Sequence, residues 1–429
     1  MPADPAPVRW TRPRPRSILR PVRIAFVSDL ETTLGASIAA SRLASALAAE
    51  GHRVRRFHLQ RQKTFYGHAR DWDAQYVGLS ALAASIWYRT KRIAPARRLA
   101  SYVVGAHLAS ALAENPCDVL HVHNLHTSAL DHRALGRLDP RLPVVWTFHD
   151  CWGFSPEAWL LPGQGGSPER IWPDGRDREA AMKVRREYFD SRQRLALVAP
   201  SRMMARLAEE NLGRPVEVVP HGLDLSVFAP VDQSAARVVF GVPEGTVCFA
   251  MVAVRFRNQY KGWAVLEKAL ASAERSFVLL IAGEEDEAAE FALGPGRVRV
   301  LGRIAQPQLL GALLSAADAL VMPSLVESFG QAAIEALACG TPVVSSNAGG
   351  LPEIVRHGET GAVVPAGDAD ALRSALDGVA KDRARWALMR PNCRAYAERE
   401  GGARLWAQRH LKIYQSLLVD SPAAAPDRS

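Results

Sequence analysis

The sequence has few cysteines and lacks long apolar runs. Its five cysteines are scattered, odd in number and without a C-x-x-C pair, which argues against a disulfide scaffold or a zinc site and favours a reducing compartment. The longest nearly uncharged stretch, residues 76–88, is too short for a membrane-spanning helix of about 20 residues. Residues 1–20 are rich in proline and arginine and lack the apolar segment of a secretory signal. We therefore expect a cytoplasmic protein that does not span a membrane, with a disordered basic tail over residues 1–20.

The charge is unevenly distributed along a chain of otherwise ordinary globular composition. With 429 residues, 48% hydrophobic and 23% charged, the chain is long enough for two or more domains. Residues 1–225 hold 32 Lys and Arg against 22 Asp and Glu, whereas residues 226–429 hold 21 against 22. Residues 84–98 set aromatic and aliphatic side chains beside basic ones, which fits either a solvated basic face or peripheral contact with anionic lipid headgroups. No recognised nucleic-acid-binding module accompanies the charge, so we expect no nucleic-acid partner.

Apolar runs that end in polar residues alternate with helical patterns along the chain, and the alternation lapses near residues 226–245. The predicted strands lie at residues 22–30, 118–124, 143–150, 195–201, 216–222, 246–254, 276–283, 298–304, 318–324 and 341–347. Strands alternating with helices predict parallel sheets, and two such series predict an α/β protein of two Rossmann-like, doubly wound domains. A ligand of such domains lies outside the carboxyl ends of the strands, hence in a cleft between them.

One glutamate in the C-terminal half lies in an unexpected place. Glu335 interrupts a predicted helix that is otherwise apolar, and Glu327 lies eight residues earlier in the preceding turn. Taken alone, such a residue is usually salt-bridged or half-exposed. A carboxylate can also accept two hydrogen bonds from a vicinal diol such as that of a ribose. Both glutamates could face the same cleft from one wall.

The start of this helix predicts a phosphate site. Ser328 and Gln331 form an S-x-x-Q capping box, which places the helix start at Phe329. The first backbone N–H groups of the helix, around Phe329 and Gly330, would then be free to bind a phosphate. Ser328, Phe329 and Gly330 are therefore among the predicted donor-binding residues. A diphosphate, a ribose and a sugar together describe a nucleotide sugar.

The segment 323–344, "PSLVESFGQAAIEALACGTPVV", resembles the E-x7-E signature of retaining GT-B glycosyltransferases of family 4, also called group 1. The segments "GGLPEIV" and "GETGAVVPAGDADALRSAL" that follow are similar to the same family. The resemblance implies a GT-B fold, with Glu335 on the ribose diol and Glu327 on the hydroxyls of the donor sugar. In "RFRNQYKGW" it implies that Arg255 and Lys261 bind the two phosphates, and two fixed cations can replace a metal there. We therefore expect a metal-independent enzyme without a cofactor.

The N-terminal half resembles the family more loosely. Gly35 matches the glycine loop on the acceptor side and is included among the predicted donor-binding residues, although Ala36 follows where the family often has a second glycine. His149 matches the family's cleft histidine and is a predicted catalytic residue, whereas a lone histidine is more often structural. "HNLHTSALDH" and "WTFHDCW" resemble a subgroup that builds exopolysaccharides of the colanic-acid type.

By this resemblance we divide the chain into an N-terminal acceptor domain at residues 21–228 and a donor-nucleotide domain at residues 229–395. A C-terminal helix over residues 396–418 is expected to cross back to the N-terminal domain. Residues 419–429 are expected to be a disordered tail.

Other motifs carry weaker predictions. His121 and His123 form an H-x-H pair without further ligands at typical spacing, so a metal is not expected and His123 is predicted to line the cleft rim. The D-x-D triplets that begin at Asp71 and Asp368 are not taken as metal sites, and Asp368 is predicted to cap a helix. Ser201 is likewise a predicted helix cap. Glu353 is a candidate for a supporting donor contact.

These observations predict a hexosyltransferase (EC 2.4) that transfers a sugar, with retention, from a nucleotide-diphosphate-sugar to a hydroxyl. The expected acceptor is a glycan or a lipid-linked saccharide in cell-surface polysaccharide synthesis, with membrane association at the cytoplasmic face as one alternative. The mechanism that the family implies is front-face substitution, in which the leaving diphosphate helps deprotonate the incoming hydroxyl. The alternatives are a GT-B phosphorylase, a sugar-nucleotide epimerase and a non-catalytic sugar-nucleotide-binding protein. The base, the sugar and the acceptor are not specified by the sequence.

Overall fold

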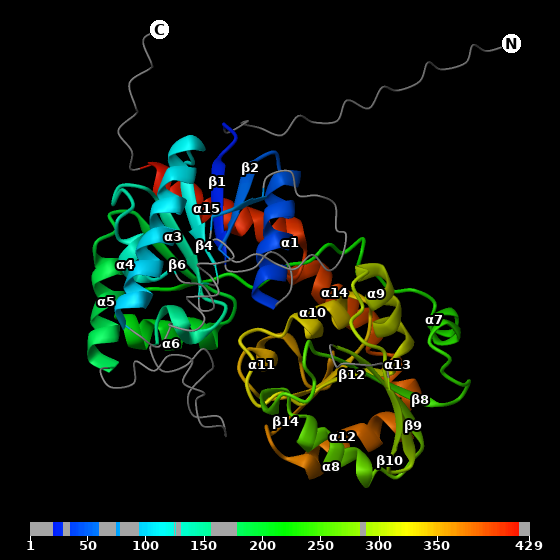
Figure 1. The fold of residues 1–429 in the computed structure, drawn as a ribbon. Coiled ribbons are helices and arrows are strands. Elements are labelled where there is room, and N and C mark those ends of the chain that lie inside the picture. Colours follow the sequence, from blue (N-terminus) through cyan, green and yellow to red (C-terminus); the bar gives the residue numbers. More distant parts are fainter. Residues whose placement is uncertain are drawn as a thin grey trace, which may run out of the picture.

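A computed structural model describes residues 20–28, 35–59, 74–77, 94–123, 125, 130–155, 178–283 and 289–419. Each domain is built around one seven-stranded sheet with helices packed on it (Figure 1). The predicted tails, the Asp71 triplet and most of the basic segment 84–98 lie outside the described residues.

The N-terminal sheet is entirely parallel and has the strand order β3-β2-β1-β4-β5-β6-β7. Its strands are β1 (Arg23–Ser28), β2 (Arg53–His58), β3 (Ala74–Tyr76), β4 (Val119–Val122), β5 (Val144–Thr147), β6 (Leu195–Ala199) and β7 (Glu217–Val218). Every residue of β4 and β5 is buried, as expected of central strands whose two faces are both covered by helices. The helices of this domain are α1 (Gly35–Ala49), α3 (Ala94–Glu114), α4 (His132–Leu135), α5 (Arg178–Asp190) and α6 (Arg202–Leu212).

The C-terminal sheet has the order β10-β11-β9-β8-β12-β13-β14, and only the edge strand β10 is antiparallel to its neighbour. Its strands are β8 (Val247–Val252), β9 (Phe277–Ala282), β10 (Ala289–Leu293), β11 (Gly296–Val300), β12 (Ala319–Met322), β13 (Val343–Ser346) and β14 (Gly361–Val364). The helices that follow the linker are α7 (Gln233–Val239), α8 (Trp263–Ala271), α9 (Pro307–Ala316), α10 (Gln331–Ala338), α11 (Leu351–Ile354), α12 (Ala369–Lys381), α13 (Arg383–Ala387), α14 (Arg390–Glu400) and α15 (Ala403–Val419).

The chain passes between the domains twice, and the two passages run side by side. Leu223 donates its N–H to Gly401 and accepts the N–H of Ala403. The second passage begins later than residue 396, because α14 still packs on α10 and ends at Glu400. The helix that returns to the N-terminal domain is therefore α15 alone, which packs along α1 (Figure 1).

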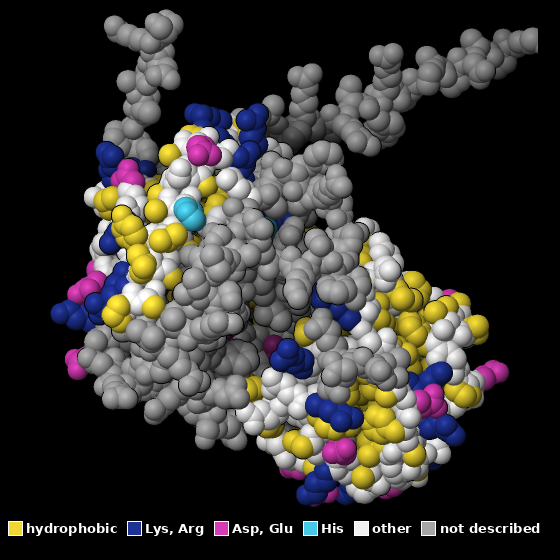
Figure 2. All heavy atoms as spheres, viewed as in Figure 1, with side chains coloured by type: hydrophobic (Ala, Val, Ile, Leu, Met, Phe, Trp, Pro, Cys, Tyr) yellow, Lys and Arg dark blue, Asp and Glu magenta, His cyan; other side chains and the backbone are white. Residues whose placement is uncertain are grey.

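One face of the molecule shows where charged side chains lie on the described parts of the two domains. On the face shown in Figure 2, Lys and Arg side chains lie on both domains among acidic and hydrophobic ones. Among the described residues, no helix combines the length and the apolar character that crossing a bilayer requires.

Each sheet has one place where the strand order reverses direction. In the N-terminal sheet it lies between β1 and β4, and in the C-terminal sheet between β8 and β12. Ligands of doubly wound sheets bind outside the carboxyl ends of the strands at such a switch point. The segments that follow these four strands are therefore where a site is expected.

Candidate active site

The switch point of the C-terminal sheet brings together the predicted phosphate-binding and sugar-binding residues. Arg255 and Lys261 lie in the segment after β8, and Glu327 lies in the segment after β12. The Asn258 side chain accepts the N–H of Tyr260 at 3.0 Å and so caps the short turn that ends at Lys261. The carbonyl of Tyr260 accepts the N–H of Leu325 at 2.8 Å, which ties the two segments to each other.

Two glycines allow the backbones around this site to approach closely. Gly262 has φ 71°, and a Cβ atom there would lie 1.9 Å from the carbonyl oxygen of Pro323. Gly349 has φ 59°, and its Cβ would lie 1.6 Å from the carbonyl oxygen of Glu327. Neither position can hold another residue without movement of the backbone. The glycine in the Lys-Gly pair is thus explained by packing against the segment that carries Glu327.

Lys261 and Glu327 form an ion pair with each other. The Lys261 Nζ lies 2.8 Å from Glu327 Oε2, and the two side chains are 35% and 15% exposed. By the prediction, Lys261 binds a phosphate of the donor and Glu327 binds the hydroxyls of its sugar. Binding of the donor would therefore break this ion pair, and each group would contact the substrate instead. Arg255 is exposed and has no side-chain partner among the described residues, so its guanidinium needs no such exchange.

The predicted start of helix α10 is wrong by two residues. The helix begins at Gln331, and its N-cap is Gly330, which has φ 109° and makes no side-chain cap. Ser328 and Gln331 do not form the capping box, because Gly330 is the N-cap and the Gln331 side chain bonds to Gly35 instead. The Ser328 carbonyl accepts the Ser201 hydroxyl of the N-terminal domain at 2.7 Å. Phe329 is buried, with its ring centroid 4.8 Å from that of His221. The first N–H groups of the helix are therefore those of Gln331 and Ala332 rather than those of Phe329 and Gly330.

The N-terminus of α10 contacts the predicted glycine loop across the domain boundary. The Gln331 side chain donates a hydrogen bond to the carbonyl of Gly35 at 2.6 Å. Gly35 is the first residue of α1. The two loops that the resemblance assigns to acceptor and donor sides thus meet each other at the start of these helices.

Glu335 is buried and paired, and its partner comes from the other domain. Its side chain is 7% exposed, and its Oε1 lies 2.7 Å from Nη2 of Arg42 on α1. The sequence left open that a glutamate in an apolar helix simply forms a salt bridge, and Glu335 does form one with Arg42. The pair also places the Glu335 carboxylate at the domain boundary, where a donor nucleotide would have to lie.

His149 follows β5 and belongs to a chain of stacked imidazoles. Its Nε2 lies 3.0 Å from Nδ1 of His123, and its ring centroid lies 5.1 Å from that of His221. The Nδ1 atom of His149 is buried and has no hydrogen-bond partner among the described residues. Burial lowers the pKa of His149 to about 4, with Asp150 acting in the opposite direction. His149 is therefore neutral near neutral pH and does not serve as an acid there, and its Nδ1 does not face solvent.

The pKa values of the neighbouring imidazoles are lowered as well, which makes the fold sensitive to acid. Burial is the largest cause for His121, His123 and His221, and it lowers the pKa of His410 to about 4. Since the unfolded chain binds these protons near pH 6.5 and the folded chain does not, stability is present above that pH and is lost as the pH falls toward 4.

We expect His410→Asn to flatten this acid dependence. In urea titrations between pH 6.5 and 4.5, the free energy of unfolding should fall about 1.4 kcal/mol less per pH unit in the variant, because one titrating group is removed. His107→Asn, at an exposed position on α3, is the control and should keep the wild-type slope. Equal slopes in all three proteins would contradict the burial-based account of His410.

Several predicted residues have structural roles. Both ring nitrogens of His121 are bonded, to Tyr414 and Thr147, each at 2.8 Å. His123 is 2% exposed and so does not line a rim, because Phe26 and the neighbouring imidazoles cover it. Asp368 caps α12 by accepting the N–H of Ala371, as predicted.

Glu353 and Ser201 together cap a helix across the domain boundary. Ser201 is the N-cap of α6, as predicted, and accepts the N–H of Met204 at 3.3 Å. The Glu353 carboxylate of the C-terminal domain accepts the N–H groups of Arg202 and Met203 at 2.9 and 3.1 Å. Both oxygens of Glu353 thus accept from α6 and join the two domains, and its predicted donor contact stays a prediction.

The sequence analysis missed Arg42, and it gave Gln331 only a capping role instead of its contact with Gly35. Arg42 lies seven residues after Gly35, hence on the same face of α1 two turns further along. That spacing is the only signal in the sequence that could have connected Arg42 to the site.

Two family models cover nearly all of the two domains. Residues 34–227 match the model described as Glycosyltransferase Family 4, and residues 232–400 match that described as Glycosyl transferases group 1. Together with two parallel-sheet domains and charged groups at a switch point, these matches define a two-domain glycosyltransferase of the GT-B fold. The chain belongs to glycosyltransferase family 4, and the predicted family and fold are confirmed.

Relatives support this assignment. The D-inositol 3-phosphate glycosyltransferase 1 of Catenulispora acidiphila is 31% identical over 350 residues, which cover 74% of this chain and 76% of that protein. The phosphatidyl-myo-inositol mannosyltransferase of Mycolicibacterium smegmatis is 31% identical over 280 residues, which cover 63% of this chain. The match spans 64% of that mannosyltransferase's own length.

Solved structures show the same fold at lower identity. Sucrose-phosphate synthase from Thermosynechococcus elongatus superposes with a TM-score of 0.72 and 21% identity over 93% of this chain and all of that one. Anabaena HepE in complex with UDP-glucose superposes with a TM-score of 0.67 and 19% identity over 92% of this chain and all of that one.

Proposed function

We propose that the protein is a hexosyltransferase that moves a sugar from a nucleotide-diphosphate-sugar to an acceptor hydroxyl, with retention of the anomeric configuration. The observation that carries the proposal is the set of charges at the C-terminal switch point. Arg255 and Lys261 follow β8, Glu327 follows β12, and Glu335 lies on the next helix. Two cations fit a diphosphate, and two carboxylates fit the hydroxyls of a ribose and a sugar.

In this proposal the cations stabilise the charge that develops on the leaving diphosphate. Arg255, Lys261 and the first N–H groups of α10 supply positive charge and N–H dipoles near that position, where negative charge develops. The leaving phosphate oxygen accepts the proton of the acceptor hydroxyl on the same face of the sugar. The neutral ring of His149 lies against the donor sugar in this proposal. Contact between the domains excludes water, which would otherwise hydrolyse the donor.

The acceptor belongs to one of two chemical classes. The resemblance to exopolysaccharide enzymes favours a glycan or a lipid-linked saccharide in cell-surface polysaccharide synthesis. The names of the two inositol-directed relatives favour instead a phosphorylated polyol or its lipid. Lys and Arg outnumber Asp and Glu in residues 1–225, which suits an acceptor of either class that carries a phosphate. The same positive charge supports peripheral contact with anionic lipid at the cytoplasmic face of a membrane.

The proposal is tested by incubating the protein with UDP-, GDP- and ADP-sugars and both acceptor classes. We expect one donor to be consumed with release of its nucleoside diphosphate, and NMR of the product to show the anomeric configuration of the donor. An inverted product would contradict the retaining mechanism. An isomerised nucleotide sugar, or a reaction that requires inorganic phosphate, would show an epimerase or a phosphorylase instead.

A further inference from the structure

The contact between Arg42 and Glu335 joins the two domains at a buried position. The distance between Arg42 Nη2 and Glu335 Oε1 is 2.7 Å, and the side chains are 22% and 7% exposed. The Arg42 guanidinium also lies 5.1 Å from the ring centroid of Phe228, in the linker between the domains. A planar guanidinium held by an aromatic ring and a carboxylate has little rotational freedom, so it fixes the carboxylate in turn.

This contact leaves part of the Glu335 carboxylate available. Within the described part of the chain, Arg42 is the only side chain that pairs with Glu335, and its approach at 2.7 Å is to Oε1. A carboxylate offers about four acceptor positions, so Oε2 can accept further hydrogen bonds. A buried carboxylate without its cation would be strongly disfavoured, and it would turn toward water if it could.

A second contact fixes the helices that carry this pair. Gln331 on α10 donates a hydrogen bond to the carbonyl of Gly35 on α1. Gln331 lies four residues before Glu335, and Gly35 lies seven residues before Arg42. The starts of α1 and α10 are therefore held to each other while Arg42 reaches Glu335 further along. The position of the Glu335 carboxylate depends on a residue of the opposite domain.

We propose that Arg42 is a positioning residue for the donor nucleotide: it holds one oxygen of Glu335 so that the other accepts the ribose hydroxyls. The inference rests on the proposed function, because it assigns a ribose to Glu335. Arg42 acts through Glu335 and does not itself contact the nucleotide. Its contribution is therefore confined to ligands that carry the 2′ and 3′ hydroxyls.

The test compares nucleotides with and without those hydroxyls. Isothermal titration first finds which of UDP, GDP and ADP binds the wild-type protein most tightly, and then measures its 2′,3′-dideoxy counterpart. Arg42→Ala should weaken binding of the ribonucleotide about tenfold, since one charge-assisted hydrogen bond loses its geometry. Binding of the dideoxynucleotide should change less than about twofold, because it makes no bond to Glu335. Arg42→Lys should recover part of the loss, because an ammonium can still reach Oε1.

Controls separate this role from a structural one. Arg53→Ala removes an exposed arginine at the start of β2 and should leave both affinities unchanged. In a Glu335→Gln background, Arg42→Ala should cost no further ribonucleotide affinity.

An equal loss of affinity for the ribonucleotide and the dideoxynucleotide would overturn the positioning role while the proposed function stands. Failure of the wild-type protein to bind any of the three diphosphates would overturn the proposed function, and this inference with it. If Arg42→Ala does not fold, Arg42→Lys and Arg42→Gln provide the same comparison.

Discussion

Replacing Lys261 with alanine is expected to lower kcat for sugar transfer by about 10²- to 10³-fold at saturating donor. Removal of one preorganised group that stabilises transition-state charge costs an enzyme about this much. The ion pair with Glu327 is partly exposed, so its loss should change the free energy of unfolding by less than about 1 kcal/mol. Steady-state kinetics and a urea titration on the same preparation measure the two effects.

Arg257 provides the control for this experiment. It lies in the same segment, is exposed, and its guanidinium packs over the ring of Phe256. Arg257→Ala should keep nearly wild-type kcat, whereas Arg255→Ala should lose activity as Lys261→Ala does. A Lys261→Ala enzyme with wild-type kcat, or equal losses at Arg255 and Arg257, would show that the cations were assigned wrongly.

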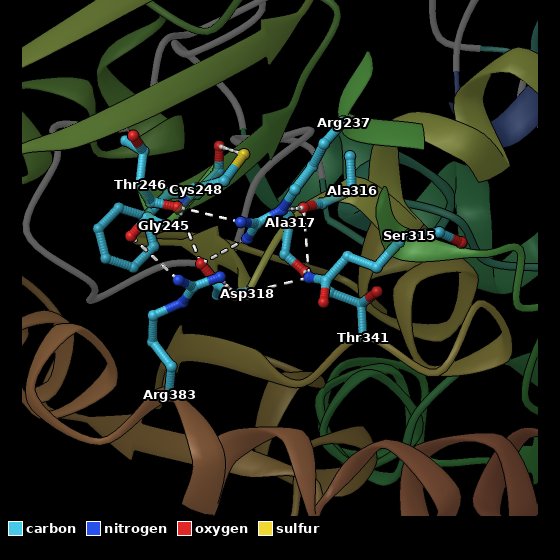
Figure 3. A network of polar contacts seen from close by, with 12 residues as sticks. Arg237, Gly245, Thr246, Cys248, Ser315, Ala316, Ala317, Asp318, Thr341 and Arg383 are labelled. Atoms are coloured by element: carbon cyan, nitrogen blue, oxygen red, sulfur yellow. Dashed lines mark hydrogen bonds and ion pairs between the residues drawn. The ribbon is translucent and has the colours of Figure 1, made fainter. Parts of the chain in front are cut away.

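Replacing Asp318 with alanine is expected to lower the free energy of unfolding by about 3–5 kcal/mol, the usual effect of breaking a buried ion pair. Asp318 Oδ2 accepts from Arg237 at 2.9 Å and from the N–H of Cys248 at 2.8 Å, while Oδ1 lies 3.1 Å from Arg383 (Figure 3). Arg237 and Asp318 are both nearly buried. Without the carboxylate, Arg237 would keep a buried charge with only backbone carbonyls as partners.

Asp370→Ala is the matched control for this network. Asp370 is 79% exposed and pairs with Arg373 at 3.4 Å, so its removal should cost less than about 1 kcal/mol. Asp318 immediately precedes β12, at the end of the strand opposite to Glu327. The folded fraction of the Asp318→Ala protein should therefore keep the wild-type kcat. Equal stability of the Asp318 and Asp370 variants would contradict the role assigned to the network.

Most of the sheet architecture is predictable from the sequence, for a physical reason. Strands covered on both faces need continuous apolar runs, and each of the ten predicted runs overlaps a strand. Of the missed strands, β2 carries three arginines and β3 has only three residues, whereas β10 and β14 are the two edge strands of the C-terminal sheet. Local pattern is a weak signal for short or charged strands, which depend on their neighbours.

The site is only partly predictable, because its geometry depends on contacts far apart in sequence. The family signature placed Arg255, Lys261 and Glu327 in neighbouring segments, and the structure brings those segments together. Their roles, and that of Glu335, remain predictions. The capping box failed because Gly330 is the N-cap and the Gln331 side chain bonds to Gly35, 296 residues earlier. Arg42 and Glu335 are 293 residues apart, so no local pattern shows that they form a pair.

The most direct test of the account is thermal unfolding of the wild-type protein and Glu335→Ala in the presence of a panel of nucleotide sugars. A ligand at about 100 times its Kd stabilises the folded state by about 2.7 kcal/mol, so the true donor should raise the Tm of the wild-type protein clearly above the other sugars. We predict that Glu335→Ala folds and loses most of that increase. An equal increase in Tm for both proteins with the same nucleotide sugar would contradict the donor site described for the C-terminal domain.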